Sequence, residues 1–193
     1  MASQRSNTIS ILLNDFFADW ETGFFSASAR DFFGAEVLHF SPRGGTVESE
    51  GGLRVTPAGA FEDVDATGST ALIVCGSQKW SGPGATDISD LLQQAEQASV
   101  PIGAICAGTL AAARAGLLDD RAHTSNGLPW LKEQVPTYRG SDRYRDVNDA
   151  VTDRGVVTAP ASAPASFAIA LLELVYPGHK SLDQTKQMLA RAR

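Results

Sequence analysis

Cys106 is the residue of this sequence best suited to covalent chemistry. It ends the apolar run 100–106, and small residues surround it in the stretch IGAICAGTLAAARAGLL at 102–118. This pattern is typical of a tight turn from a strand into a helix, where free N–H groups and the helix dipole favour a thiolate. The Ala107 amide would point towards an oxygen on which negative charge develops. The alternative is a structural cysteine, since free Cys is among the most buried residue types, and the spacing alone leaves both interpretations open.

The elements that must position Cys106 are predicted by apolar runs, helical spacing and turn residues. The expected strands are 8–15, 35–42, 69–77 and 100–106, with a short strand at 121–126, a hairpin within 144–161 around Asp153-Arg154-Gly155, and a small hairpin or loop after residue 50. The expected helices are 21–33, 87–99, 109–119, one that starts within 128–134, 164–176 and a terminal helix at 181–193. Strands that alternate with helices predict a mainly parallel sheet covered on both faces.

Three segments with reactive or polar residues should meet at one edge of this sheet. They are residues 15–21, residues 75–77 and the turn at Cys106. Each follows a predicted strand, and ligands of such folds sit beyond the carboxyl ends of the strands. The sequence therefore predicts a site at that edge.

Composition limits the classes of function. The 193 residues suit a single domain, 1–193, and a net charge of −6 argues against a large basic nucleic-acid surface. No apolar stretch has the length of a membrane span, and the apolar part of the N-terminus is too short for a signal peptide. Two cysteines are too few for a disulfide scaffold, and the three histidines and two cysteines lack metal-ligand spacing. We expect a cytoplasmic protein without metal, nucleic-acid or membrane partners.

Four sequence blocks, in this order, resemble the ThiJ/PfpI superfamily, also called the class I glutamine amidotransferase-like fold. The blocks are FADWETGFF, ALIVCGSQKW, GAICAGTLAAARAGLLDDRAHTSN and DAVTDRGVVTAPASAPASFAIALLELV, and the resemblance spans residues 10–176. The superfamily includes the Parkinson-disease-associated deglycase and PfpI-type intracellular peptidases. The resemblance implies a flavodoxin-like three-layer α/β sandwich with a mainly parallel sheet, a nucleophile elbow and a homodimeric assembly.

The resemblance also assigns roles to residues. Cys106 matches the family nucleophile, and Glu21 matches the acidic residue beside that thiol. Gly76 and Ser77 match a Gly-Gly turn that offers a backbone N–H to the same pocket. Together with the Ala107 amide they would form the oxyanion pocket.

The chain departs from the family pattern at the position of the catalytic base. Many members carry a histidine where this sequence has Asn126, which cannot take a proton at neutral pH. His123 lies three residues earlier, and on an extended strand this odd offset points it to the opposite face. Asp19 flanks the Glu21 loop as a further accessory candidate or a helix cap. A Cys106–Glu21 pair is therefore expected in place of a Cys-His-acid triad.

The resemblance leaves the reaction open between several classes. The His-x-Glu pair of true glutaminase domains is absent from TAPASAPASF, which argues against ammonia transfer from glutamine. A small-molecule hydrolase, hydratase or lyase, such as an amidase, an isonitrile hydratase or a glyoxalase-like enzyme, needs no cofactor. The alternatives are a non-catalytic redox or oxidative-stress protein that senses oxidation through Cys106 and a non-catalytic binding domain. A regulatory disulfide between Cys75 and Cys106 is a further hypothesis.

Overall fold

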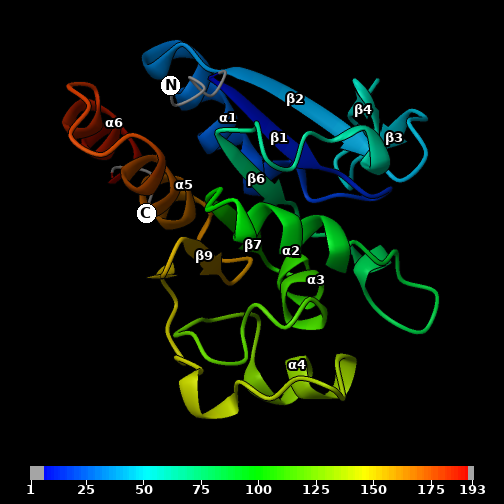
Figure 1. The fold of residues 1–193 in the computed structure, drawn as a ribbon. Helices are drawn as coiled ribbons and strands as arrows, with labels where there is room; N and C mark the ends of the chain where they lie inside the picture. The colour runs from blue at the N-terminus through cyan, green and yellow to red at the C-terminus, as the bar shows by residue number, and fades with distance from the viewer. Residues whose placement is uncertain (1–6, 191–193) are drawn as a thin grey trace.

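The computed structural model describes residues 7–190 and contains a seven-stranded sheet (Figure 1). Its strand order is β5-β2-β1-β6-β7-β9-β8, and every pairing is parallel except that of β8 with β9. The strands are β1 (Thr8–Leu12), β2 (Glu36–Ser41), β5 (Gly59–Ala60), β6 (Ala71–Val74), β7 (Ile102–Ile105), β8 (Val151–Asp153) and β9 (Val156–Ala159). A separate antiparallel pair, β3 (Val47–Glu48) and β4 (Arg54–Val55), forms a small hairpin that begins before the excursion expected after residue 50.

Helices cover both faces of the sheet. The helices are α1 (Asp19–Phe33), α2 (Ser89–Gln97), α3 (Gly108–Arg114), α4 (Leu128–Gln134), α5 (Pro164–Val175) and α6 (Leu182–Ala190). Buried side chains of α1, α5 and α6 pack in one apolar cluster with Ile9, Ile11 and Ile73. Those of α2 and α3 pack in another with Leu72 and Val74. Because successive strand residues point to opposite faces, the two clusters make the three-layer α/β sandwich that the sequence predicts.

The turn of the predicted hairpin has the expected geometry. Arg154 and Gly155 have φ angles of 44° and 82°, so both central residues adopt the left-handed region that a tight turn between β8 and β9 requires. Helix α4 occupies residues 128–134 as predicted. Segment 121–126 is not a regular strand, because only an isolated bridge between His123 and Tyr144 forms there. The predicted end of the terminal helix, 191–193, lies outside the described residues.

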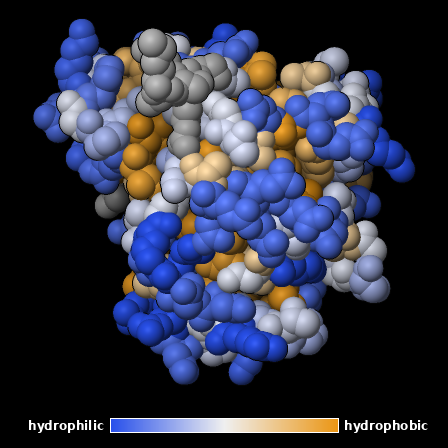
Figure 2. Space-filling view, viewed as in Figure 1, coloured by the Kyte–Doolittle hydropathy of each residue, from blue (hydrophilic) through white to orange (hydrophobic). Residues whose placement is uncertain are grey.

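Hydrophilic side chains cover most of the surface seen in Figure 2, and apolar residues show between them. Within residues 7–190, no helix is both long and apolar enough to cross a membrane.

Candidate active site

Cys106 occupies a sharp turn between β7 and α3. Its φ angle is 55°, a left-handed conformation that non-glycine residues rarely adopt. The Cys106 N–H donates to the Ala159 carbonyl at 2.9 Å, and the Cys106 carbonyl accepts from the Thr109 hydroxyl at 2.6 Å. These bonds hold a strained residue in place, as is common where strain serves a site.

Small residues around the turn are explained by close packing. A Cβ on Gly108 would lie 2.4 Å from the Val74 carbonyl oxygen, and one on Gly103 would lie 2.8 Å from Leu171 Cδ1. Helix α3 can therefore start against β6 only because residue 108 has no side chain. The strand–turn–helix predicted from small residues follows from this contact.

Glu21 places its carboxyl group in the interior, from the first turn of α1. The residue is fully buried, and Oε2 accepts a hydrogen bond from the Gly76 N–H at 2.7 Å. The second oxygen, Oε1, is buried without a well-formed hydrogen bond, while the Cys106 thiol interacts with the carboxyl group. Burial raises the pKa of Glu21 from 4.5 to about 7, although the bonds from Cys106 and Gly76 oppose this rise.

Gly76 lies between the Glu21 carboxyl group and Cys106, and it has no side chain to keep them apart. A Cβ at this position would lie 2.4 Å from Glu21 Oε2 and 2.9 Å from Cys106 Cβ. Residue 76 therefore has no room for a side chain, and the acid and the cysteine are brought side by side. This is the meeting of the three segments that the sequence predicts for the carboxyl edge of the sheet.

Asn126 contacts the thiol from another side. Its Nδ2 lies 3.1 Å from Cys106 Sγ and donates to it, while its Oδ1 accepts from the Ala161 N–H at 2.9 Å. The bond to Ala161 fixes the amide so that its NH2 group faces the sulfur. Asn126 thus supplies a hydrogen bond at the thiol but no proton acceptor of useful basicity.

The charge state of the cysteine differs from the sequence expectation. Burial, followed by the negative charge of Glu21, raises the pKa of Cys106 from 9 to about 12, although Asn126 and the Ala107 N–H lower it. The expected stabilisation of a thiolate by the helix start is therefore outweighed. Between about pH 7 and pH 12, the Cys106–Glu21 pair retains one proton.

His123 and Asp19 do not join the thiol. The buried His123 ring uses Nδ1 with the Arg121 carbonyl at 2.7 Å and Nε2 with the Tyr138 hydroxyl at 2.5 Å. These two bonds make His123 a structural histidine, although segment 121–126 is not the regular strand on which the offset argument relied. Asp19 accepts from the Ser49 hydroxyl at 2.5 Å and so ties α1 to the β3–β4 excursion.

Ser77 and Ala107 follow Gly76 and Cys106 in the chain. The buried Ser77 hydroxyl donates to the Asp15 carbonyl at 2.7 Å, which joins the loops after β6 and β1. Ala107 follows the elbow and is buried, and its N–H lowers the pKa of Cys106.

Cys75 is buried, and its thiol donates to the Ala18 carbonyl at 3.4 Å. Both cysteines are free, so the structure holds no Cys75–Cys106 disulfide.

An open hollow of about 500 Å³ lies beside Asn126, and its lining includes neither Cys106 nor Glu21. Ser125, Gly127, Pro160 and Ala161 form part of its wall. This volume lies within the range of small-molecule sites. Among the described residues, no group of three or more His, Cys, Asp or Glu side chains could hold a metal ion.

Comparisons with known proteins agree with this architecture. Residues 7–174 match the sequence model of the DJ-1/PfpI family. The structure of the DJ-1 superfamily protein Atu0886 from Agrobacterium tumefaciens superposes with a TM-score of 0.88 at 37% identity, covering 96% of this chain and 99% of the other. A thiJ/pfpI family protein from Bacillus anthracis gives a TM-score of 0.81 at 26% identity, with 98% of both chains covered. The "Uncharacterized protease YoaZ" of Bacillus subtilis (strain 168) is 28% identical over 81% of this chain and 77% of its own length.

Proposed function

This chain belongs to the DJ-1/PfpI family, and on that premise we propose that it is a small-molecule hydrolase, hydratase or lyase that uses a Cys106–Glu21 pair. The observation that carries the proposal is the fully buried Glu21 carboxyl beside the elbow thiol, with a pKa raised to about 7. A carboxylate of this pKa is a suitable general base near neutral pH. Asn126 stands at the thiol where a triad would need a base.

The first step is the same for an amide or another carbonyl substrate. Glu21 accepts the proton of the Cys106 thiol as Sγ forms a bond to the electrophilic carbon, and the π electrons of the C=O bond move to its oxygen. The Ala107 and Ser77 amides are the proposed donors to that oxygen. Because the thiol pKa is about 12, proton transfer accompanies the attack instead of preceding it.

The second half of an amide hydrolysis returns the site to its starting state. Glu21 gives its proton to the leaving nitrogen as the C–N bond breaks, which leaves a thioester on Cys106. Water then attacks the thioester carbon, transfers one proton to Glu21 and releases the carboxylic acid. The sulfur leaves as a thiolate and regains the proton from Glu21, so atoms and charges balance.

A small substrate is favoured over a peptide. The curated relatives carry the name protease, but the His123 ring is bonded to Tyr138 and Arg121. The hollow beside Asn126 has a volume of about 500 Å³, but neither Cys106 nor Glu21 lines it. The missing imidazole is therefore the observation that supports chemistry on a small electrophile.

The alternative is a redox role at the same cysteine. Cys106 is only partly buried, so an oxidant can reach it, whereas Cys75 is fully buried. A sulfinate at Cys106 would accept hydrogen bonds from Asn126 and from a protonated Glu21. The same geometry therefore supports selective oxidation.

The experiment compares wild type, Cys106→Ala and Glu21→Gln on an amide, an α-oxoaldehyde and an isonitrile. Glu133→Gln, on the exposed surface of α4, is the matched control for the loss of a carboxylate. Turnover should be lost in the first two variants and kept in the control. Undiminished turnover in Cys106→Ala refutes the proposal. An inactive wild type whose Cys106, but not Cys75, becomes sulfinate with two or more equivalents of peroxide assigns the redox role.

A further inference from the structure

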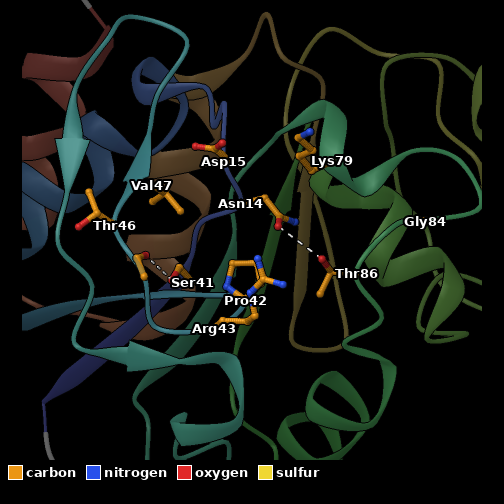
Figure 3. A pocket seen from close by; sticks show the side chains of 11 residues that line it. Asn14, Asp15, Ser41, Pro42, Arg43, Thr46, Val47, Lys79, Gly84 and Thr86 are labelled. Atoms are coloured by element: carbon orange, nitrogen blue, oxygen red, sulfur yellow. Dashed lines mark hydrogen bonds between the residues drawn. The ribbon is translucent and has the colours of Figure 1, made fainter.

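A second cavity, of about 420 Å³, lies at the carboxyl ends of β1 and β2 (Figure 3). Its lining includes neither Cys106 nor Glu21. Residues from three loops meet there: Asn14 and Asp15 after β1, Arg43 after β2, and Lys79 and Thr86 after β6. The cavity is therefore separate from the thiol site, although the bond from Ser77 to the Asp15 carbonyl connects their walls.

Asn14 provides an unused hydrogen-bond donor in this cavity. The side chain is only 2% exposed, and its Nδ2 has no hydrogen-bond partner among residues 7–190. Its Oδ1 is paired with the Thr86 hydroxyl at 3.5 Å (Figure 3). Buried amide donors in folded proteins are almost always satisfied by protein, water or ligand, so this NH2 group is available to an acceptor atom in the cavity.

Two cations flank that donor. Figure 3 shows Asn14 between Lys79 and Arg43. Both side chains belong to exposed residues, and neither forms an ion pair with a carboxylate among residues 7–190. Lys79 Nζ lies 5.6 Å from the centre of the Phe16 ring.

The single carboxylate of the lining is partly engaged. Asp15 Oδ1 accepts a hydrogen bond from the Glu48 N–H at 3.0 Å. With Arg43 and Lys79 opposed by Asp15 alone, the lining carries a net positive charge in a chain whose net charge is −6. A positive concave site of this kind attracts anions.

We propose that this cavity binds the oxyanion group of a small phosphate- or carboxylate-bearing metabolite. The guanidinium of Arg43 offers paired N–H donors to two oxygens, Lys79 offers a compact charge, and the Asn14 NH2 group donates to a third position. The site goes beyond the proposed function, because none of its donors takes part in the Cys106 chemistry. The volume accommodates the rest of a small metabolite beside the anionic group.

The test is isothermal titration of the full chain with inorganic phosphate and, separately, with acetate, at constant ionic strength set by chloride. Phosphate or acetate should bind to wild type, and Arg43→Ala and Lys79→Ala should each weaken binding at least tenfold. Lys132→Ala, an exposed cation on α4, is the matched control and should bind as wild type does. The anion that binds more tightly shows whether the metabolite carries a phosphate or a carboxylate group.

Asn14→Ala should also weaken binding, with circular dichroism used to show that the variant is folded. If that variant fails to fold, the two exposed cation variants still decide the question. Absence of binding to wild type, or equal binding to wild type and Arg43→Ala, overturns the proposal. Cys106→Ala should bind the anion as wild type does, so a failure of the anion site and a failure of the Cys106 chemistry give different results.

Discussion

Glu21→Gln offers a direct test of the buried carboxyl through the pH dependence of stability. Glutamine keeps the shape of the side chain and an oxygen that accepts from the Gly76 N–H, but it cannot ionise. In wild type, the folded state holds a proton on Glu21 up to about pH 7, whereas the unfolded chain releases it near pH 4.5. Between these values the folded state binds more protons, so stability falls as pH rises.

The size of this effect follows from the pKa values. The stabilising contribution is fully present below about pH 4.5 and is lost as pH rises through about 7. The rise from 4.5 to about 7 corresponds to about 3 kcal/mol, since one pKa unit is worth about 1.4 kcal/mol. Glu21→Gln lacks this contribution. As pH rises from 4 to 8, wild type should therefore lose about 3 kcal/mol of its free energy of unfolding relative to the variant.

Urea unfolding measured at pH steps between 4 and 8, under reducing conditions, gives the required free energies. Only the difference between variant and wild type is used, because the titrations of groups away from Glu21 are common to both and cancel. Glu133→Gln, which removes an exposed carboxylate on α4, should follow the wild-type curve. If the curves of Glu21→Gln and wild type run parallel over this range, the carboxyl group is not held in a buried, proton-binding environment and the reasoning fails.

Three further changes test the geometry of the elbow. Asn126→Ala removes the hydrogen bond to Sγ, so alkylation of Cys106 by iodoacetamide should slow by at least about tenfold, since a bond to a charged group is worth about 1.5–3 kcal/mol. An unchanged rate would show that the amide does not support the thiolate. Cys106→Gly should unfold with a free energy about 1 kcal/mol higher than Cys106→Ala, because glycine adopts a φ of 55° without strain; equal stabilities in urea would contradict the strained turn. Gly76→Ala places a Cβ 2.4 Å from Glu21 Oε2, so turnover and the raised pKa of Glu21 should both be lost. Rate assays and pH-dependent unfolding measure the two effects. Full activity would mean that the acid and the thiol need not touch.

Much of the fold follows from local patterns in the sequence. Apolar runs such as 71–74 and 102–105 are buried on both faces, as parallel strands between helical layers require. The hairpin turn has positive φ at both Arg154 and Gly155; Gly155 signals this in the sequence, whereas Arg154 does not. Because parallel strands end at one edge, the meeting of Glu21, Gly76 and Cys106 could be inferred before any coordinates were known.

The orientation of individual polar groups could not be inferred in the same way. Asn126 faces the sulfur because the Ala161 N–H, 35 residues away, holds its carbonyl oxygen. The unused amide of Asn14 and the cations around it likewise depend on three loops that no local pattern connects. Such contacts depend on tertiary packing, and the sequence provides no spacing from which to read them.

At the Cys106 thiol, burial raises the pKa by more than the start of helix α3 lowers it. A helix start stabilises a nearby anion by about 0.3–1 kcal/mol, and α3, which runs only from Gly108 to Arg114, is a short helix. Burial and the carboxylate of Glu21 raise the thiol pKa from 9 to about 12, which corresponds to about 4 kcal/mol against the thiolate. The larger effect dominates, so a pre-formed Cys106 thiolate is disfavoured at neutral pH. Attack by its sulfur is therefore favoured when it is coupled to transfer of the thiol proton, and we propose the neighbouring carboxyl group with a pKa of about 7 as the acceptor.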